Sequence, residues 1–442
     1  MTEITTEKAR IGAPSAKPFI DGFTEEGENL SPVNTGTNSS STSETTPGQV
    51  PSAGPLAGAS AKSHSHGGGV GIPDSSRAGR LTSYKLADFK PLTGLEEDWR
   101  FTPLKRLRGL HNEVLSGSAP SVAVTAPEGV VVETVGRDDV RIGSAAIPED
   151  RVSANAWENF TEATVITVPA ELQLDGEVSV VLTGTSTEAS AQHIVIVAGR
   201  FSKSRIVLDH QGSAIVSENV EILVEDGADL TVISLQEWND DAVHASSQQA
   251  KLGRDAKFKH IVVSLGGDVV RMTPSTRFTA PGAEAEMFGL YFADAGQHLE
   301  QRLFVDHAVA NCKSNVLYKG ALQGRNAHTV WVGDVLIRKE AEGTDTYEAN
   351  RNLVLTDGAR ADSVPNLEIE TGLIEGAGHA SATGRFDDEH LFYLMARGIP
   401  EDVARRLVVR GFLNEIIQQI KVPALEERLT EAVERELAAS DN

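Results

Sequence analysis

Between about residues 120 and 375 the chain consists of short β-branched runs that no crossover helix separates. The runs include SVAVTA, VSVVLTG, HIVIVAG, SRIVLDH and FKHIVVSLGG, with Gly, Asp and Asn between them. Short runs of this composition, bounded by turn residues, are typical of β-strands. Roughly 250 residues of strands exclude a doubly wound α/β fold, because that fold needs a helix between successive strands. A large β-sandwich and a β-solenoid remain.

The turn signals between these strands are irregularly spaced. GAD at 227–229, GAE at 282–284 and GAR at 358–360 mark turns, but no fixed repeat period links them. A regular hexapeptide β-helix is therefore not expected. One helix is expected to interrupt the strands, either around Ala156–Ala163 or just after Trp238. The residues alone leave an irregular solenoid and a sandwich equally open.

The N-terminal part of the chain differs in composition from this β-rich region, which we place at residues 120–386. Residues 1–80 are rich in Ser, Thr, Gly and Pro and contain few large apolar side chains, which predicts a disordered tail. Residues 81–119 are predicted to form a small N-terminal helical segment in two short pieces, because Pro103 interrupts the helical spacing. Its apolar residues are expected to anchor it on the core: Trp99, Phe101, Leu104, Leu107 and Leu110.

Residues 387–442 are predicted to form a C-terminal helical domain of three helices. Asp387 and Asp388 can cap the first helix and Gly398 can end it. Pro400 and Pro423 can open the second and the third. The second helix carries an apolar stripe of Val403, Leu407, Val408, Phe412 and Ile416, and the third one of Leu425, Leu429, Val433 and Leu437. We interpret both stripes as packing surfaces, which a partner could share.

Charge and cysteine content exclude several classes of function. The net charge of −23 argues against a general binder of nucleic acid or of anionic membranes, since both need a positive field. Cys312 is the single cysteine, so the chain can form neither an intramolecular disulfide nor a cysteine-rich metal site. No apolar run reaches membrane-spanning length, and MTEITTEKAR lacks the pattern of a signal peptide. We expect a cytoplasmic protein.

No motif for a catalytic nucleophile or a nucleotide is present. The sequence contains no Gly-x-Ser-x-Gly, no Walker A phosphate loop and no HExxH. Asp306 and His307 are neighbours in a predicted strand, so their side chains should point to opposite faces. The remaining candidates are interpreted as structural or as weak sites: His64 and His66 in the tail, the acidic run 387–389, His328 in a strand, and Cys312 as a plain thiol.

The stretch from Glu348 to Phe412 contains the change from strands to helices and also a family resemblance. Its first half alternates with period two, its second half has helical spacing, and we expect a short turn carrying His379 between them. NLVL, PNLEI and DDEHLFYLMARGI resemble the C-terminal signature of the SufB/SufD family, closer to its SufD branch. EEDWRFTPL and NCKSNVLYKGAL also fit, so the resemblance covers about residues 80–440.

The resemblance implies both a fold and a function. The implied fold is mainly β, a right-handed irregular β-helix (β-solenoid) core with a small N-terminal helical segment and a C-terminal helical domain. The implied function is that of a non-catalytic subunit of the SUF iron–sulfur cluster assembly scaffold complex. Such a subunit pairs with a SufB-like paralogue and docks a SufC-like ATPase. An iron–sulfur cluster would be held transiently at the interface with the paralogue.

The resemblance also singles out His379 as a metal ligand in a site shared with the partner. Proteins of the SufD branch carry a histidine at this place, and many have a cysteine two residues earlier, where this chain has Ala377. The ligand set on this side therefore reduces to His379, whose neutral imidazole can bind iron. Glu368, Glu370 and Glu375 could assist.

Two other functions remain open on the residues. A β-helix can belong to a polysaccharide-active enzyme, although 5% aromatic residues leave few rings for sugar stacking. Assay of polyuronate cleavage would distinguish this from a scaffold. A purely structural solenoid without a cluster role is the third possibility, and copurifying partners would reveal it.

Overall fold

The structure, a computed structural model, describes residues 79–112, 114–145, 147–386 and 388–439. Residues 1–78 of the predicted disordered tail, with His64 and His66, and the predicted cap at Asp387 therefore lie outside the described residues. The last residue assigned to the tail, Arg80, is held by an ion pair with Asp98, so the ordered part of the chain begins slightly earlier than predicted. In the part of the chain that is described, no helix is both long enough and apolar enough to cross a membrane.

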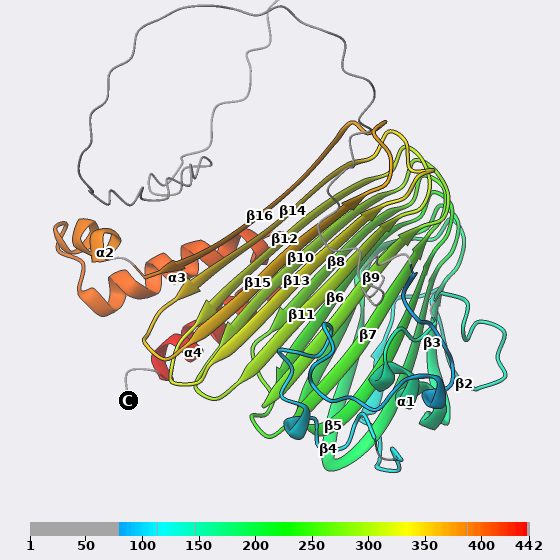
Figure 1. Ribbon diagram of the computed structural model, residues 1–442, viewed down its shortest axis with the longest axis horizontal. Coiled ribbons are helices and arrows are strands. Elements are labelled where there is room, and N and C mark those ends of the chain that lie inside the picture. Colours follow the sequence, from blue (N-terminus) through cyan, green and yellow to red (C-terminus); the bar gives the residue numbers. More distant parts are fainter. Residues whose placement is uncertain (1–78, 113, 146, 387, 440–442) are drawn as a thin grey trace, which may run out of the picture. The chain divides into compact units, whose positions relative to one another are not determined.

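Two parallel sheets built from alternate strands form the core (Figure 1). The strands of one, here called the even sheet, are β6 (Asp229–Trp238), β8 (Lys257–Ser264), β10 (Glu284–Ala293), β12 (Lys313–Leu322), β14 (Asp345–Val354) and β16 (Gly376–Arg385). Those of the odd sheet are β7 (Val243–Leu252), β9 (Val269–Phe278), β11 (His298–His307), β13 (His328–Ile337) and β15 (Arg360–Ile369). Each strand pairs in parallel with the strand two places later in sequence. This is a β-solenoid, as predicted, and not a sandwich.

Two long strands continue from one sheet into the other at the N-terminal end of the solenoid. β4 (Gln173–Ala198) and β5 (Lys203–Val224) pair along nearly their whole length, and β5 then pairs with β6 by its first half and with β7 by its second. Three shorter strands complete this end: β1 (Ser121–Thr125) and β2 (Val131–Gly136), both antiparallel to their neighbours, and β3 (Glu162–Val168).

An α-helix lies directly before β3 in the chain. α1 (Arg151–Asn159) begins with a capping box between Asp150 and Ser153, in which each residue satisfies a backbone N–H of the other. The observed helix is therefore shifted toward the N-terminus relative to the helix predicted around Ala156–Ala163. The helix starts earlier and ends at Asn159, because Phe160 is already extended and the β-branched run after it pairs with β4. A turn, not a helix, follows Trp238.

The turns explain why the sequence shows no fixed period. Successive strands of the even sheet start at residues 229, 257, 284, 313, 345 and 376, so the chain travels a different distance around each turn of the solenoid. The predicted turns at Gly227, Gly282 and Gly358 are confirmed, and all three glycines have positive φ. At Gly282 a Cβ would also lie 2.0 Å from the side-chain oxygen of Asp255, so that side chain would have to move, but it is the positive φ that favours glycine.

Alternate residues of each strand point into the solenoid, where they form the main apolar core. The outer face of the even sheet is covered by the helices α3 (Glu401–Ile417) and α4 (Pro423–Ala439), which pack on Val207, Ile233 and Leu235.

The outer face of the odd sheet is covered by the N-terminal segment and α1. In that segment Trp99, Leu107 and Leu110 are buried, as the anchor prediction requires. Its helical pieces are the short 3-10 helices η2 (Leu86–Asp88) and η3 (Leu104–Leu107).

The C-terminal helices follow the prediction in α4 but only partly in α3. α2 (Asp388–Met395) is followed by Gly398 at φ +82°, and Pro423 opens α4, whose predicted stripe is buried. In α3 the predicted stripe was only partly right: Ile416 is buried and Phe412 packs on the same apolar cluster, but Val403 and Leu407 are 39% and 46% exposed. The buried residues of the helix are Ala404, Val409, Leu413, Ile416 and Ile417.

Candidate functional site

His379 lies in a strand and not in the predicted turn. β16 runs from Gly376 to Arg385 and pairs with β14 so that His379 stands opposite Glu348. The small residues before His379 suit this strand, because a Cβ on Gly378 would approach the Tyr347 ring to 3.1 Å. We had interpreted these small residues as a turn, but they allow close packing between β14 and β16. The His379 side chain is 44% exposed.

The interior neighbour of His379 is the carboxyl group of Glu348. Its side chain is fully buried, and its Oε1 lies 3.8 Å from His379 Nδ1. No described residue makes a hydrogen bond of ordinary geometry to either carboxyl oxygen. Gly333 on the facing strand makes room for the group, because a Cβ there would lie 2.4 Å from Glu348 Oε2.

Burial decides the protonation state of Glu348. Desolvation, helped by the nearby charge of Asp334, raises the pKa of Glu348 to about 8, although the backbone N–H of Asn366 acts in the opposite direction. The carboxyl group is therefore mostly protonated at neutral pH. His379 and Glu348 form a pair in which an exposed imidazole covers a neutral, buried acid.

The three carboxylates predicted to assist His379 are placed differently. Glu368 belongs to β15, and Glu370 and Glu375 lie in the loop before β16. A backbone N–H donates to Glu370, and Glu375 Oε2 lies 3.5 Å from Lys313 Nζ. Glu348 was missed because it lies 31 residues before His379. One signal pointed to it: a run of inward polar residues at alternate positions, Thr346, Glu348, Asn350 and Asn352.

The pair lies at the open end of the solenoid. β15 and β16 are the last strands of their sheets, and in the described part of the chain no further strand pairs with their outer edges (Figure 1). His379, Ala380, Ser381, Ala382 and Thr383 are all exposed along β16. Such an edge presents unpaired backbone N–H and C=O groups that another chain can satisfy.

The remaining sequence candidates have structural surroundings. Cys312 is fully buried, and burial raises its pKa, so its thiol is unreactive. Asp306 binds Arg338 at 2.6 Å, while His307 points to the other face of β11 and contacts Ser314. This is the divergence predicted for strand neighbours. His328 is the first residue of β13, with its Nε2 2.7 Å from Asp362.

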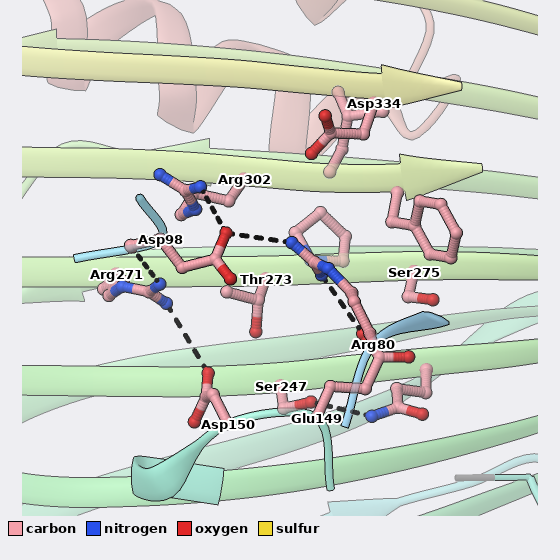
Figure 2. A pocket seen from close by; sticks show the side chains of 14 residues that line it. Arg80, Asp98, Glu149, Asp150, Ser247, Arg271, Thr273, Ser275, Arg302 and Asp334 are labelled. Atoms are coloured by element: carbon pink, nitrogen blue, oxygen red, sulfur yellow. Dashed lines mark hydrogen bonds and ion pairs between the residues drawn. The ribbon is translucent and has the colours of Figure 1, made fainter. Parts of the chain in front are cut away.

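A small pocket on the outer face of the odd sheet is filled by an ion-pair network (Figure 2). Asp98 from the N-terminal segment accepts hydrogen bonds from Arg80 at 2.9 Å and from Arg302 at 2.8 Å. The Arg271 guanidinium stacks 3.9 Å over the Trp99 ring and lies 3.7 Å from Asp150. The network fastens the N-terminal segment to the sheet, so we assign it a structural role.

Comparison with known proteins identifies the family. Residues 180–412 match the family model described as SUF system FeS cluster assembly, SufBD core domain. The chain belongs to the SufBD family. An iron-sulfur cluster assembly SufBD family protein of Mycobacterium tuberculosis is 54% identical over 371 residues, which is 82% of this chain and 93% of that protein. A protein of the same description from Mycobacterium leprae is 54% identical over 373 residues, 82% and 95% of the two chains.

A second SufBD family protein of Mycobacterium leprae is more distant. It is 28% identical over 211 residues, which is 48% of this chain and 24% of that protein. That organism therefore has two members of the family, of which one is much more similar to this chain. The matched SufBD core region contains β14, β16 and the His379–Glu348 pair.

Proposed function

We propose that this SufBD family protein is the SufD-like, non-catalytic subunit of a SUF scaffold complex. The observation that carries the proposal is the open solenoid end, where His379 and Glu348 lie beside an unpaired strand edge. Family membership supports a role in iron–sulfur cluster assembly. The absence of a phosphate loop from the sequence agrees with ATP use by a different chain.

The open end is the proposed contact with a SufB-like paralogue. The exposed edges of β15 and β16 can continue their sheets into a second solenoid by backbone hydrogen bonds. Two family members in Mycobacterium leprae support a pairing of paralogues. A pairing at this end would place His379 in the interface and would remove the free strand edges from solvent.

His379 and Glu348 are the proposed contribution of this chain to a transient cluster. The cluster is cargo, and one imidazole cannot hold it alone, so further ligands, thiolate or carboxylate, come from the partner. Ala377 removes any thiolate ligand from that position of β16. Glu348 becomes a carboxylate ligand or proton acceptor only after it loses its proton, which an incoming cation would favour.

The C-terminal helices are the proposed docking surface for a SufC-like ATPase. α2 and the start of α3 expose large apolar side chains: Phe392, Tyr393, Met395, Val403 and Leu407. Deleting all three helices would uncover the apolar outer face of the even sheet, so substitution is the sharper test. Phe392→Ser together with Tyr393→Ser should abolish copurification of the ATPase at unchanged solenoid stability. ATPase retention by this variant would contradict the proposed surface.

Coexpression with candidate SufB-like and SufC-like chains tests the proposal directly. Native mass measurement should show one assembly that contains all three chains. In that assembly His379→Ala should leave folding intact, since removing an exposed side chain costs under about 0.5 kcal/mol. The recovered iron and sulfide, and cluster delivery to an acceptor apoprotein, should fall.

Two substitutions serve as controls for His379→Ala. Ser381→Ala removes another exposed polar side chain from β16, and His328→Ala removes a histidine bound to Asp362. Both assemblies should carry normal iron. Iron content equal to wild type in His379→Ala would show that this chain only holds its partner in place, and a chain that forms no complex with either candidate would overturn the pairing itself.

A further inference from the structure

A second histidine–carboxylate group lies at the opposite end of the solenoid, inside the core. His210 and Glu218 belong to the two halves of β5, on either side of the corner between the sheets, and His244 belongs to β7. All three side chains are buried, with at most 1% exposure. Within the described residues they form a group whose ligand-type atoms lie within 4.8 Å of one another.

Each imidazole is oriented by an oxygen that can only accept a hydrogen bond. His210 Nδ1 lies 2.9 Å from the backbone oxygen of Leu235, and His244 Nδ1 lies 2.7 Å from the amide oxygen of Gln236. The Leu235 oxygen cannot donate and is nearer to His210 Nδ1 than Gln236 Nε2 is, at 3.2 Å, so His210 Nδ1 carries a proton. His244 Nδ1 also lies 3.1 Å from the indole nitrogen of Trp238, which can only donate. When Trp238 donates to the Gln236 oxygen instead, at 3.0 Å, His244 Nδ1 carries the proton and its Nε2 has a bare lone pair. An oxygen acceptor on Nδ1 orients the histidine ligands of metals in the same way.

Both Nε2 atoms point at the same carboxylate. His210 Nε2 lies 3.1 Å from Glu218 Oε1, and His244 Nε2 lies 3.4 Å from Glu218 Oε2. Where a nitrogen lone pair faces a carboxylate oxygen, the contact is repulsive unless a proton or a metal cation lies between the two atoms.

His244 Nε2 has no hydrogen bond of good geometry to any described residue. Because this nitrogen is buried, an unsatisfied lone pair there costs stability. A cation between the two rings and the carboxylate would remove that cost.

We propose that His210, Glu218 and His244 bind one divalent transition-metal ion inside the solenoid. One ion at the centre of the three groups would satisfy both lone pairs and the carboxylate. The separations of 3.1 and 3.4 Å match the distance between ligands in a tetrahedral site, about 3.3 Å when each bond is about 2.0 Å. Two histidines and a glutamate are a known ligand set for zinc, and two histidines and a carboxylate are one for iron(II).

The surroundings are those of a held metal. Ser246 donates to Glu218 Oε2 at 2.7 Å, and Trp238 Nε1 donates to the Gln236 oxygen at 3.0 Å. Each ligand therefore has its remaining polar atom fixed by a neighbour. Because the site is closed to solvent, the ion would be acquired during folding, and its binding would add to the stability of the folded chain. The site is independent of the proposed role in cluster assembly.

The test is the metal content of the full-length chain. His64, His66 and His379 are replaced by Ala, so that neither the tail nor the open end can contribute an ion. The protein is expressed in medium supplemented with zinc, iron(II), manganese or cobalt, dialysed against a chelator, and analysed by elemental mass spectrometry. We expect about one ion per chain in at least one arm, with X-ray absorption showing two imidazoles and only N/O ligands at about 2.0–2.1 Å.

Glu218→Gln is compared with His260→Gln as the matched control. His260 is also a buried histidine of the solenoid, bonded to Gln248 at 2.8 Å. Glu218→Gln should lose at least about nine-tenths of the ion, a tenfold loss of affinity or more, while His260→Gln keeps it. Metal below about 0.1 ion per folded chain in every arm, or an ion with sulfur or without imidazole ligands, would overturn the proposal. The absorption spectrum of the unsubstituted site decides the matter even if Glu218→Gln fails to fold.

Discussion

Glu348→Gln should change how the stability of the protein depends on pH. In the folded chain the pKa of Glu348 is raised from 4.5 to about 8 by burial and by the charge of Asp334. The folded state therefore binds a proton more tightly than the unfolded state does. Glutamine has nearly the same shape and never ionises, so the substitution removes this proton linkage while keeping the packing against Gly333.

The sign and size follow from linkage. Below pH 4.5 Glu348 is protonated in both states and carries no penalty. As pH rises from 4.5 to about 8, the unfolded chain releases its proton and the folded chain does not, so the wild type loses about 1.4 kcal/mol per pH unit. The loss amounts to about 3 kcal/mol at pH 7 and approaches about 5 kcal/mol above pH 8.

Urea unfolding of the two proteins between pH 4 and pH 9 measures the effect. The difference in unfolding free energy, Glu348→Gln minus wild type, should be smallest at pH 4, grow steadily, and level off above pH 8. Comparing two variants under identical conditions removes the contributions of titrating groups that do not interact with Glu348. Parallel curves over the whole range would show that the carboxyl group is solvated or paired, and would refute the assignment of a neutral buried acid beside His379.

Three further substitutions test the packing. Asp98→Asn removes one of the two carboxylates beside the Arg302 guanidinium, which is 6% exposed and keeps Glu300 Oε1 at 3.6 Å. Urea unfolding should show a loss of about 1–3 kcal/mol, reduced because Asp98 is itself half exposed. An unchanged midpoint would argue against the fastening role of the network. Gly320→Ala would place a Cβ 1.8 Å from the Tyr291 ring and should cost at least about 2 kcal/mol. Gly411→Ala, in an open position of α3, should instead stabilise by about 0.5–1 kcal/mol, and an equal loss in both would contradict this account.

Local patterns predicted the elements of the fold well. The positive-φ turn at Gly282 and the buried stripe beginning at Leu425 depend on residues close together in sequence, and both were predicted. The buried stripe of α3 differs from the predicted one, because Val403 and Leu407 are apolar but exposed. Helical spacing identifies an apolar face, whereas the sheet decides which face is buried.

The site was predicted only in part, since its geometry depends on register between turns of the solenoid. His379 was proposed through the family resemblance, but its neighbour Glu348 is a full turn earlier. The length of each turn varies, so no sequence period connects the two residues. His210 and Glu218 meet for the same kind of reason, because the chain turns a corner between them.

The distribution of covering elements connects the fold to the proposed function. The outer face of the even sheet is covered by α3 and α4, and that of the odd sheet by the N-terminal segment and α1. At the N-terminal end, β1 and β2 close on the sheets in antiparallel pairing. In the described part of the chain the last edges, β15 and β16, have no such cover. Free parallel edges invite uncontrolled association. The proposed partner chain would cover the free edges of β15 and β16, and it would also complete the proposed cluster site beside His379 and Glu348.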